Sequence, residues 1–113
     1  MQLPANLSAA KLRLEDGETV LAVQPVLRRK GIFGNRYGEL YVTDRRIAFM
    51  KAGMGALGKL GGKPMLSFER SSSSSEKQPH KAQWMVVVTS GSQSERFLTD
   101  EPAATSLVDA ARA

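Results

Sequence analysis

Apolar and polar residues alternate most regularly over residues 37–50, and this pattern predicts a β-hairpin. Each arm has one apolar face, as a half-buried strand does. The arms are joined by a polar stretch around Asp44, whose side chain can bond its own backbone and stabilise a turn. β-Branched and aromatic residues dominate both arms, which suits a pleated surface. The predicted apolar face consists of Leu40, Val42, Ile47 and Phe49.

Four further segments have strand character. Apolar residues alternate or run together at residues 19–27, 65–70, 83–89 and 94–99, which predicts a strand at each. The segment 83–89 is apolar on both faces, so we expect a central strand that is covered on both sides. Residues 71–81 are serine-rich and polar, and they fit either a poor edge strand or a disordered loop.

The C-terminal residues predict one helix. Thr99 or Asp100 can cap its first turn, and Pro102 stands where the missing N–H costs nothing. Small apolar residues then recur at three- and four-residue steps, which places them on one side of the helix. These residues are Ala103, Ala104, Leu107, Val108 and Ala111.

Residues 1–18 predict a short lead-in. Leu7, Ala10 and Leu14 share one side of a helical turn or two. A turn with three carboxylates follows, and we expect these groups to face solvent because no further metal ligand stands near them. The three carboxylates belong to Glu15, Asp16 and Glu18.

Consecutive strands followed by one helix predict an α+β fold with an antiparallel sheet. The length of 113 residues suits a single domain over residues 1–113. The absence of cysteine excludes disulfides, thiol catalysis and zinc–thiolate sites, and it fits a reducing compartment. No apolar run is long enough to span a bilayer, and the N-terminus lacks a signal-peptide pattern. We therefore expect a cytoplasmic protein.

Positive charge is concentrated in one segment. The whole chain carries a formal net charge of +5. Residues 28–63 contain nine Lys or Arg residues against two acids, and nine minus two gives this segment +7. Such a bias indicates an anionic partner: a lipid surface, a nucleic acid or an acidic protein. A solvated face that only keeps the protein soluble is an equally open interpretation.

The predicted hairpin resembles a known family. Its residues Gly38-x-Leu40-Tyr41-Val42-Thr43-Asp44-x-Arg46-Ile47-x-Phe49 are similar to the signature hairpin of GRAM and bacterial pleckstrin-homology-like domains, which read roughly Gly-x-Leu-hydrophobic-hydrophobic-Thr-x-x-Arg-hydrophobic-x-Phe. The resemblance implies a strongly bent antiparallel sheet of about seven strands, a partly open barrel, closed by a C-terminal helix. It also implies a binding module for lipid headgroups or protein partners, without catalysis.

The resemblance also suggests which basic residues could bind anions. In pleckstrin-homology domains the loop after the first strand often carries a basic phosphate-binding pattern. Lys30 and Arg36 match its first and last positions, whereas Gly34 stands where a second basic residue is expected. This departure leaves general attraction of anions rather than specific phosphoinositide recognition. The predicted headgroup-binding residues are Arg28, Arg29, Lys30, Arg36, Lys51, Lys59 and Lys63.

The glycine-rich segment 51–64 resembles a phosphate-binding P-loop only superficially. Gly53, Gly58 and Lys59 have the P-loop spacing, but Leu60 replaces the Ser or Thr that would hold Mg²⁺. Instead, apolar residues between lysines suit insertion into an anionic membrane surface. A disordered connector, or a loop that folds back on the body, is the open alternative. The predicted inserting residues are Met54, Leu57 and Leu60.

No set of residues in the sequence predicts catalysis. His80 is the only histidine, it stands in a polar segment, and we expect it to be exposed. Paired carboxylates, a Ser–His–Asp order and a metal cluster are all missing, so we expect no enzyme, metal or cofactor. The expected partner is an anionic lipid, at a peripheral membrane site, or an acidic protein surface. Self-association through exposed sheet edges is the alternative, and nucleic acid is disfavoured because no recognised motif occurs.

Overall fold

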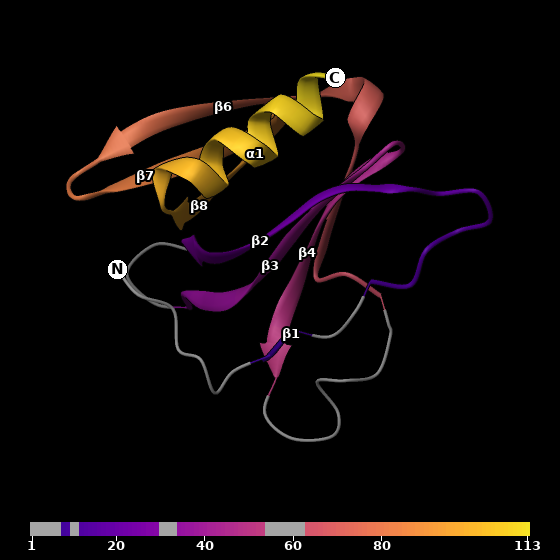
Figure 1. Ribbon diagram of the computed structural model, residues 1–113, viewed down its shortest axis with the longest axis horizontal. Helices are drawn as coiled ribbons and strands as arrows, with labels where there is room; N and C mark the ends of the chain where they lie inside the picture. Colours follow the sequence, from indigo (N-terminus) through magenta and orange to yellow (C-terminus); the bar gives the residue numbers. More distant parts are fainter. Residues whose placement is uncertain (1–7, 10–11, 30–33, 54–62) are drawn as a thin grey trace.

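The computed structural model describes residues 8–9, 12–29, 34–53 and 63–113. In these residues the fold is an antiparallel sheet with one C-terminal helix (Figure 1), so the predicted α+β class is confirmed. The elements are β1 (Ser8–Ala9), β2 (Val20–Arg29), β3 (Arg36–Thr43), β4 (Arg46–Gly53), β5 (Leu66–Glu69), a 3₁₀ turn (Arg70–Ser72), β6 (Ser73–His80), β7 (Gln83–Ser90), β8 (Gln93–Thr99) and α1 (Glu101–Arg112).

The strands follow the order β1-β4-β3-β2-β8-β7-β6, and β5 pairs with β4. The two halves of the sheet meet at strand β2. It pairs with β3 from Val20 to Arg28, but with β8 only from Leu27 to Arg29. The sheet therefore consists of two halves that share β2, and α1 packs against β6 and β7 of one half and β2 and β3 of the other (Figure 1). The two ends of the strand order do not pair in the described residues, so the sheet is not closed.

Two irregularities occur in β2 before the stretch that pairs with β8. The register shifts between Val20 and Ala22, which marks a bulge that twists the strand. Pro25 cannot donate a backbone hydrogen bond, and it lies outside the short stretch that pairs with β8. Its carbonyl oxygen instead accepts a hydrogen bond of 2.9 Å from Oγ1 of Thr99, the last residue of β8.

The main core lies between the two halves of the sheet and α1. Phe49 of β4 and Phe97 of β8 are fully buried, with ring centroids 5.5 Å apart. The apolar face predicted for the hairpin is confirmed, since all four of its side chains are at most 2% exposed. A Cβ on Gly38 would overlap the carbonyl oxygen of Met50 and approach the Phe49 ring to 2.8 Å. The glycine therefore lets the Phe49 ring lie directly against β3.

The C-terminal helix begins as predicted. Asp100 is the N-cap, and its Oδ1 accepts a hydrogen bond of 2.8 Å from the backbone N–H of Ala103. Pro102 occupies the first turn. The buried side of α1 carries Ala103, Ala104, Leu107 and Val108.

Two predictions about the second half of the chain are also resolved. Residues 73–80 form β6, which pairs with no described strand other than β7, so the edge-strand alternative is confirmed. Strand β7 lies between β6 and β8, and Met85 to Val88 are all buried. Val86 and Val88 belong to the main core, whereas Met85 and Val87 belong to a separate apolar cluster. The prediction of a strand covered on both faces is confirmed.

The predicted helical lead-in is wrong for the described residues. Ser8 and Ala9 form a strand that pairs with the end of β4. Leu12 is buried against Tyr41 and Met50, whereas Leu14 is 43% exposed. Leu7 and Ala10, which we expected on the helix, lie outside the described residues. The apolar outer surface of the β3–β4 hairpin holds the lead-in extended, and this long-range contact outweighs a weak local helical pattern.

Candidate functional site

Four predicted headgroup-binding residues lie at one end of the strands. Arg28 near the end of β2 pairs with Arg36 at the start of β3, and Lys51 lies near the end of β4. Lys63 stands two residues before Met65, whose N–H bonds the carbonyl oxygen of Phe49 in β4 at 2.9 Å. Strand polarity therefore brings these positions to the end of the sheet where residues 30–33 and 54–62 connect the strands.

The side chains of this end are exposed. Arg36, Lys51 and Lys63 are each exposed, and none forms an ion pair within the described residues. Nη1 of Arg36 donates to the carbonyl oxygen of Asn35 at 3.1 Å, which leaves its charge uncompensated. We call Arg36, Lys51 and Lys63 the basic rim.

Arg28 does not belong to the basic rim. It is 8% exposed, and its Nε donates to Oε1 of Glu95 at 3.0 Å. Its Nη1 lies 3.6 Å from Sδ of Met65. Because Glu95 compensates its charge, Arg28 forms a structural ion pair and is not a cation presented to a ligand.

The remaining predicted site residues belong to the segments 30–33 and 54–62. These positions lie outside the described residues, so their predicted roles stay predictions. They are the basic residues Lys30 and Lys59 and the inserting residues Met54, Leu57 and Leu60.

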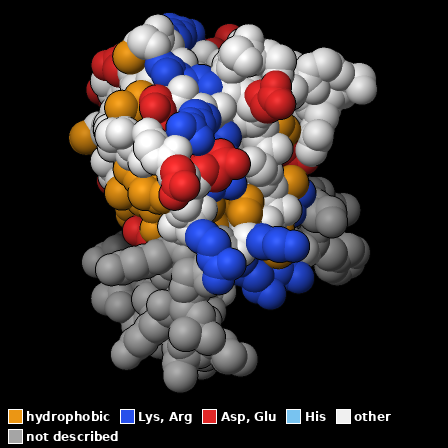
Figure 2. Space-filling model, turned by 90° about the vertical axis from the view of Figure 1, so that its right-hand side faces the viewer, with side chains coloured by type: hydrophobic (Ala, Val, Ile, Leu, Met, Phe, Trp, Pro, Cys, Tyr) orange, Lys and Arg blue, Asp and Glu red, His pale blue; other side chains and the backbone are white. Residues whose placement is uncertain are grey.

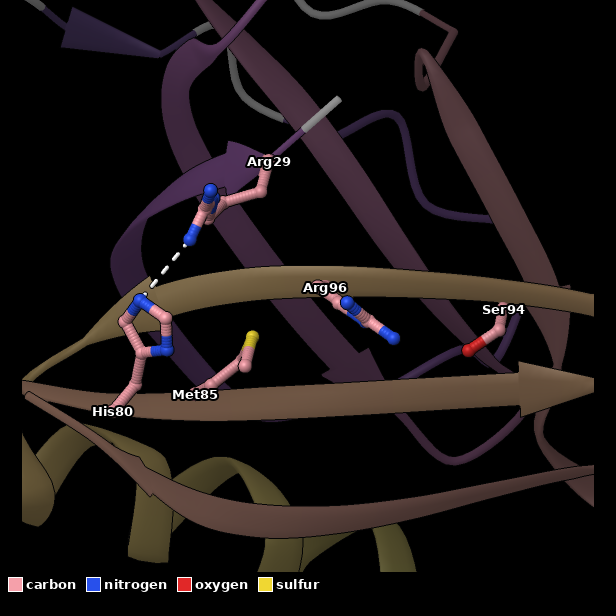
Figure 3. Close-up of a pocket in the computed structure, with 5 residues that line it drawn as sticks. All are labelled: Arg29, His80, Met85, Ser94 and Arg96. Carbon is pink, nitrogen blue, oxygen red and sulfur yellow. Dashed lines mark hydrogen bonds between the residues drawn. The ribbon is translucent and has the colours of Figure 1, made fainter. Parts of the chain in front are cut away.

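Arg29 lies on the opposite face of β2 from Arg28 and contributes to a hollow. It is directly opposite Arg96 of β8 in the strand register, so both side chains leave the same face of the sheet. A hollow of about 410 Å³ is lined by Arg29, His80, Met85, Ser94 and Arg96. In Figure 3 the Arg29 guanidinium points from β2 toward the His80 ring, and Arg96 and Ser94 follow along β8. We call this feature the arginine hollow.

His80 is not the exposed loop residue that we predicted. It is the last residue of β6, it is partly buried, and Nη1 of Arg29 lies 3.0 Å from its Nε2. A guanidinium group can only donate, so a hydrogen bond between the two side chains has Nε2 of His80 as its acceptor and the ring proton on Nδ1. The bond orients Arg29 and leaves its positive charge uncompensated.

The floor of the arginine hollow is apolar. Met85 is 7% exposed, and it clusters with Leu27, Val87 and Leu98 on the face of the sheet opposite the main core. Tyr37 packs against the edge of this cluster. Such a floor lowers the local dielectric constant and strengthens the field of the arginines above it.

At the hairpin-turn end of the strands the charge of Arg46 is compensated by Glu18. Nε and Nη2 of Arg46 donate to Oε2 and Oε1 of Glu18 at 2.8 and 2.9 Å, which is a bidentate ion pair. Oγ1 of Thr43 donates to Oε2 of Glu18 at 2.7 Å. Asp44 also accepts a hydrogen bond of 3.0 Å from the N–H of Thr19. These contacts fasten the segment before β2 to the turn of the hairpin.

The prediction that Glu18 faces solvent is therefore wrong, although Glu15 and Asp16 are exposed as expected. The Glu18 side chain is completely buried. The hydrogen bonds from Arg46 lower the pKa of Glu18 to about 2 against the opposing effect of burial, and Thr43 adds to the lowering. Glu18 is buried and ionised, and both of its carboxylate oxygens accept hydrogen bonds from the protein. It is therefore structural, because no open position remains for a ligand.

Charged side chains are distributed unevenly over the surface. On the face shown in Figure 2, acidic and basic side chains alternate over the upper part, whereas Lys and Arg side chains gather without acids near the residues that are not described. In the described part of the chain, no cluster of three His, Cys, Asp or Glu side chains could hold a metal ion. The one described helix is too short and polar to cross a membrane.

Comparison with known proteins adds no relative. No family model, curated protein or solved structure matches this chain.

Three polar residues of the arginine hollow were missed from the sequence, as was Met85 of its floor. Arg96, Ser94 and His80 stand in polar, unremarkable contexts, and only the pairing of β2 with β8 brings them beside Arg29. The alternation of Phe97 with Arg96 does show that Arg96 leaves the outer face of its strand. That signal becomes informative only when the neighbouring strand and its register are known.

Proposed function

We propose that this protein is a non-catalytic binding module of the pleckstrin-homology-like type that associates with anionic lipid surfaces through the basic rim. The hairpin motif, the two sheet halves that share β2 and the helix packed between them all support this architecture.

The observation that carries the proposal is the exposure of three uncompensated cations at one end of the strands. Arg36, Lys51 and Lys63 come from three separate segments, and the chain folds so that they lie around the same end. The opposite end also carries arginines, but Arg46 and Arg45 are paired there with Glu18 and Glu15. A strand end that gathers three exposed cations without an ion pair in the described residues is suited to an extended anionic partner.

The expected affinity is modest. Each cation near an anionic bilayer contributes about 1 kcal/mol, so the basic rim contributes roughly 3 kcal/mol. Lys30 and Lys59 stand in the connections at this end and would raise the total to about 5 kcal/mol, which corresponds to a dissociation constant just below the millimolar range. Insertion of Met54, Leu57 and Leu60 adds at most about 1.5–3 kcal/mol each. Charge and insertion together bring binding to the micromolar range.

Co-sedimentation with vesicles tests the proposal. The protein should bind phosphatidylcholine vesicles that contain phosphatidylserine, and binding should fall as salt rises. Lys51→Glu should weaken binding strongly, whereas Arg13→Glu, an equal charge change at an exposed residue of the other strand end, should have a small effect. Leu57→Asp should also weaken binding. Equal binding to neutral and anionic vesicles would exclude the proposal.

Self-association through a sheet edge is the alternative. Strand β6 pairs only with β7 in the described residues, so its other edge is available. That edge carries Glu76, Lys77 and Pro79, and charged residues and proline are typical of edges that resist pairing with another chain. Light scattering after size exclusion decides between the two, because the lipid proposal expects a monomer and the alternative expects a dimer or larger species.

A further inference from the structure

We infer that the arginine hollow is a second anion site, separate from the basic rim, and that its ligand is a phosphomonoester dianion. The hollow lies on the outer face of the β2–β8–β7 region, and its five lining residues include none of the basic rim. Its ligand is therefore expected to be a discrete group rather than an extended surface.

The register of β2 and β8 brings Arg29 and Arg96 together. Residues directly opposite on antiparallel strands have Cα atoms about 5 Å apart, and these two are Cα partners on β2 and β8. Like charges in this position repel each other and destabilise the pair. An anion bound between the two guanidinium groups would remove the repulsion, so the arrangement suits a ligand and costs stability without one.

No carboxylate compensates these two arginines in the described residues. Glu95 is adjacent to Arg96 in sequence but lies on the other face, where it pairs with Arg28. Glu76 is on the same face as Arg96, in the row that runs across Val87. It is two strands away, about 10 Å by strand spacing, and its carboxylate accepts a hydrogen bond of 3.2 Å from Gln78.

Among the described residues, Arg29 has one side-chain partner, His80. His80 accepts one hydrogen bond through Nε2, which holds the guanidinium over the hollow and adds no negative charge. The guanidinium retains its other N–H donors, and Arg96 makes no hydrogen bond or ion pair with any described residue. Above the apolar floor of the hollow, the Arg29 guanidinium is therefore oriented by His80, and the Arg96 guanidinium is available to a ligand.

These donors match the chemistry of a phosphomonoester. The site carries two positive charges while His80 is neutral, and a phosphomonoester carries about −1.5 to −2 at pH 7. Its terminal oxygens can accept bidentate bonds from two guanidinium groups and a further bond from the hydroxyl of Ser94. The volume of about 410 Å³ holds such a group together with a small organic substituent. The same phosphoryl group can come from a lipid headgroup or from a soluble metabolite.

Binding of inorganic phosphate to the full chain, followed by backbone amide NMR at constant ionic strength set with chloride, tests the site. Saturable shifts are expected at Arg29, His80, Ser94 and Arg96. Arg96→Gln should weaken phosphate binding about tenfold, because it removes one bidentate charged pair. Arg36→Gln, which removes the same charge from the basic rim, should leave the affinity unchanged.

Arg96→Glu separates loss of binding from loss of folding. The new carboxylate would stand opposite Arg29 and pair with it, so this variant should fold at least as well as the wild type and bind no phosphate. The site is overturned if phosphate produces no saturable shifts at these residues, if Arg96→Glu binds phosphate as the wild type does, or if Arg36→Gln weakens binding as much as Arg96→Gln.

Two further probes distinguish the sources of the phosphoryl group. Glycerol 3-phosphate represents a soluble phosphomonoester, and phosphatidylcholine vesicles with phosphatidic acid present the same group on a lipid. If Arg96→Gln weakens binding of glycerol 3-phosphate alone, the ligand is soluble; if it weakens vesicle binding alone, the ligand is a headgroup. An unchanged affinity in both arms overturns the site. Lys51→Glu should affect the vesicle arm only, which keeps this test separate from that of the basic rim.

Discussion

Arg46 and Arg29 are both partly buried arginines of the same sheet, but they meet opposite partners. Arg46 is held in a bidentate ion pair by the buried carboxylate of Glu18. Arg29 is held by the neutral ring of His80 and faces Arg96 across the strand pair. A carboxylate partner uses the charge to fasten two segments of the chain, whereas a neutral partner fixes the geometry and leaves the charge for a ligand.

The same contrast occurs between two consecutive residues. Arg28 and Arg29 leave opposite faces of β2, and Glu95 compensates only the first. Burial alone therefore does not identify the functional arginine. The chemical nature of the partner does, and this suggests which variants should alter folding and which should alter binding.

Removing the carboxylate of the compensated region should have the largest effect. Glu18→Gln leaves Arg46 without its counter-charge and weakens the bond from Thr43. Breaking one side of a buried ion pair costs about 3 kcal/mol, so the free energy of unfolding in denaturant should fall by this amount. Phosphate binding to the folded variant should not change. A loss of less than about 0.5 kcal/mol, as for ordinary surface changes, would show that the pair is not structural.

Acid should reproduce the effect of that substitution. The pKa of Glu18 is about 2 in the folded protein and 4.5 in its reference state, so its stabilisation is present above pH 4.5 and is lost as the pH falls toward 2. The difference amounts to about 3 kcal/mol. Unfolding free energies measured over this range should fall more steeply for the wild type than for Glu18→Gln. Parallel curves for the two proteins would contradict the assignment.

The glycine of the hairpin motif should prove structural as well. Gly38→Ala places a methyl group against the carbonyl oxygen of Met50 and the ring of Phe49, and overpacking of this kind costs about 1–3 kcal/mol. Thermal unfolding should show the loss. Gly91→Ala is the control, because nothing lies near its Cβ and only its φ of +60° adds strain of about 1 kcal/mol. An equal or smaller loss at Gly38 would mean that the close approach of Phe49 relaxes at little cost.

Reversing one charge in the uncompensated region should have a small effect of opposite sign. Arg96→Glu replaces a repulsive cross-strand pair with an attractive one, so the free energy of unfolding should rise by about 0.5 kcal/mol. Arg13→Glu, an exposed change away from the arginine hollow, should leave it nearly constant. Destabilisation by Arg96→Glu would show that the two arginines do not repel each other in the folded protein.

Local patterns in the sequence predicted most elements of the fold but little of the arginine hollow. The hairpin and α1 have strong periodicity and β7 is a continuous apolar run, and each forms as expected. The sequence left the structure of the β6 segment open between strand and loop, because its residues are almost entirely polar. Its backbone hydrogen bonds to β7 define the strand, and such bonds leave no hydrophobic pattern in the sequence. The burial of Glu18 depends on Arg46, which is 28 positions away. The pairing of Arg29 with Arg96 depends on a register between distant strands, which no local pattern encodes.

An arginine side-chain NMR spectrum, recorded on the Nε–Hε groups during a phosphate titration, tests the central claim most directly. The claim is that the partner of each arginine determines whether it can bind an anion. The signals of Arg29 and Arg96 should shift together and saturate, whereas those of Arg28 and Arg46, held by Glu95 and Glu18, should stay in place. Equal shifts at all four arginines, or a larger shift at Arg46 than at Arg96, would contradict it.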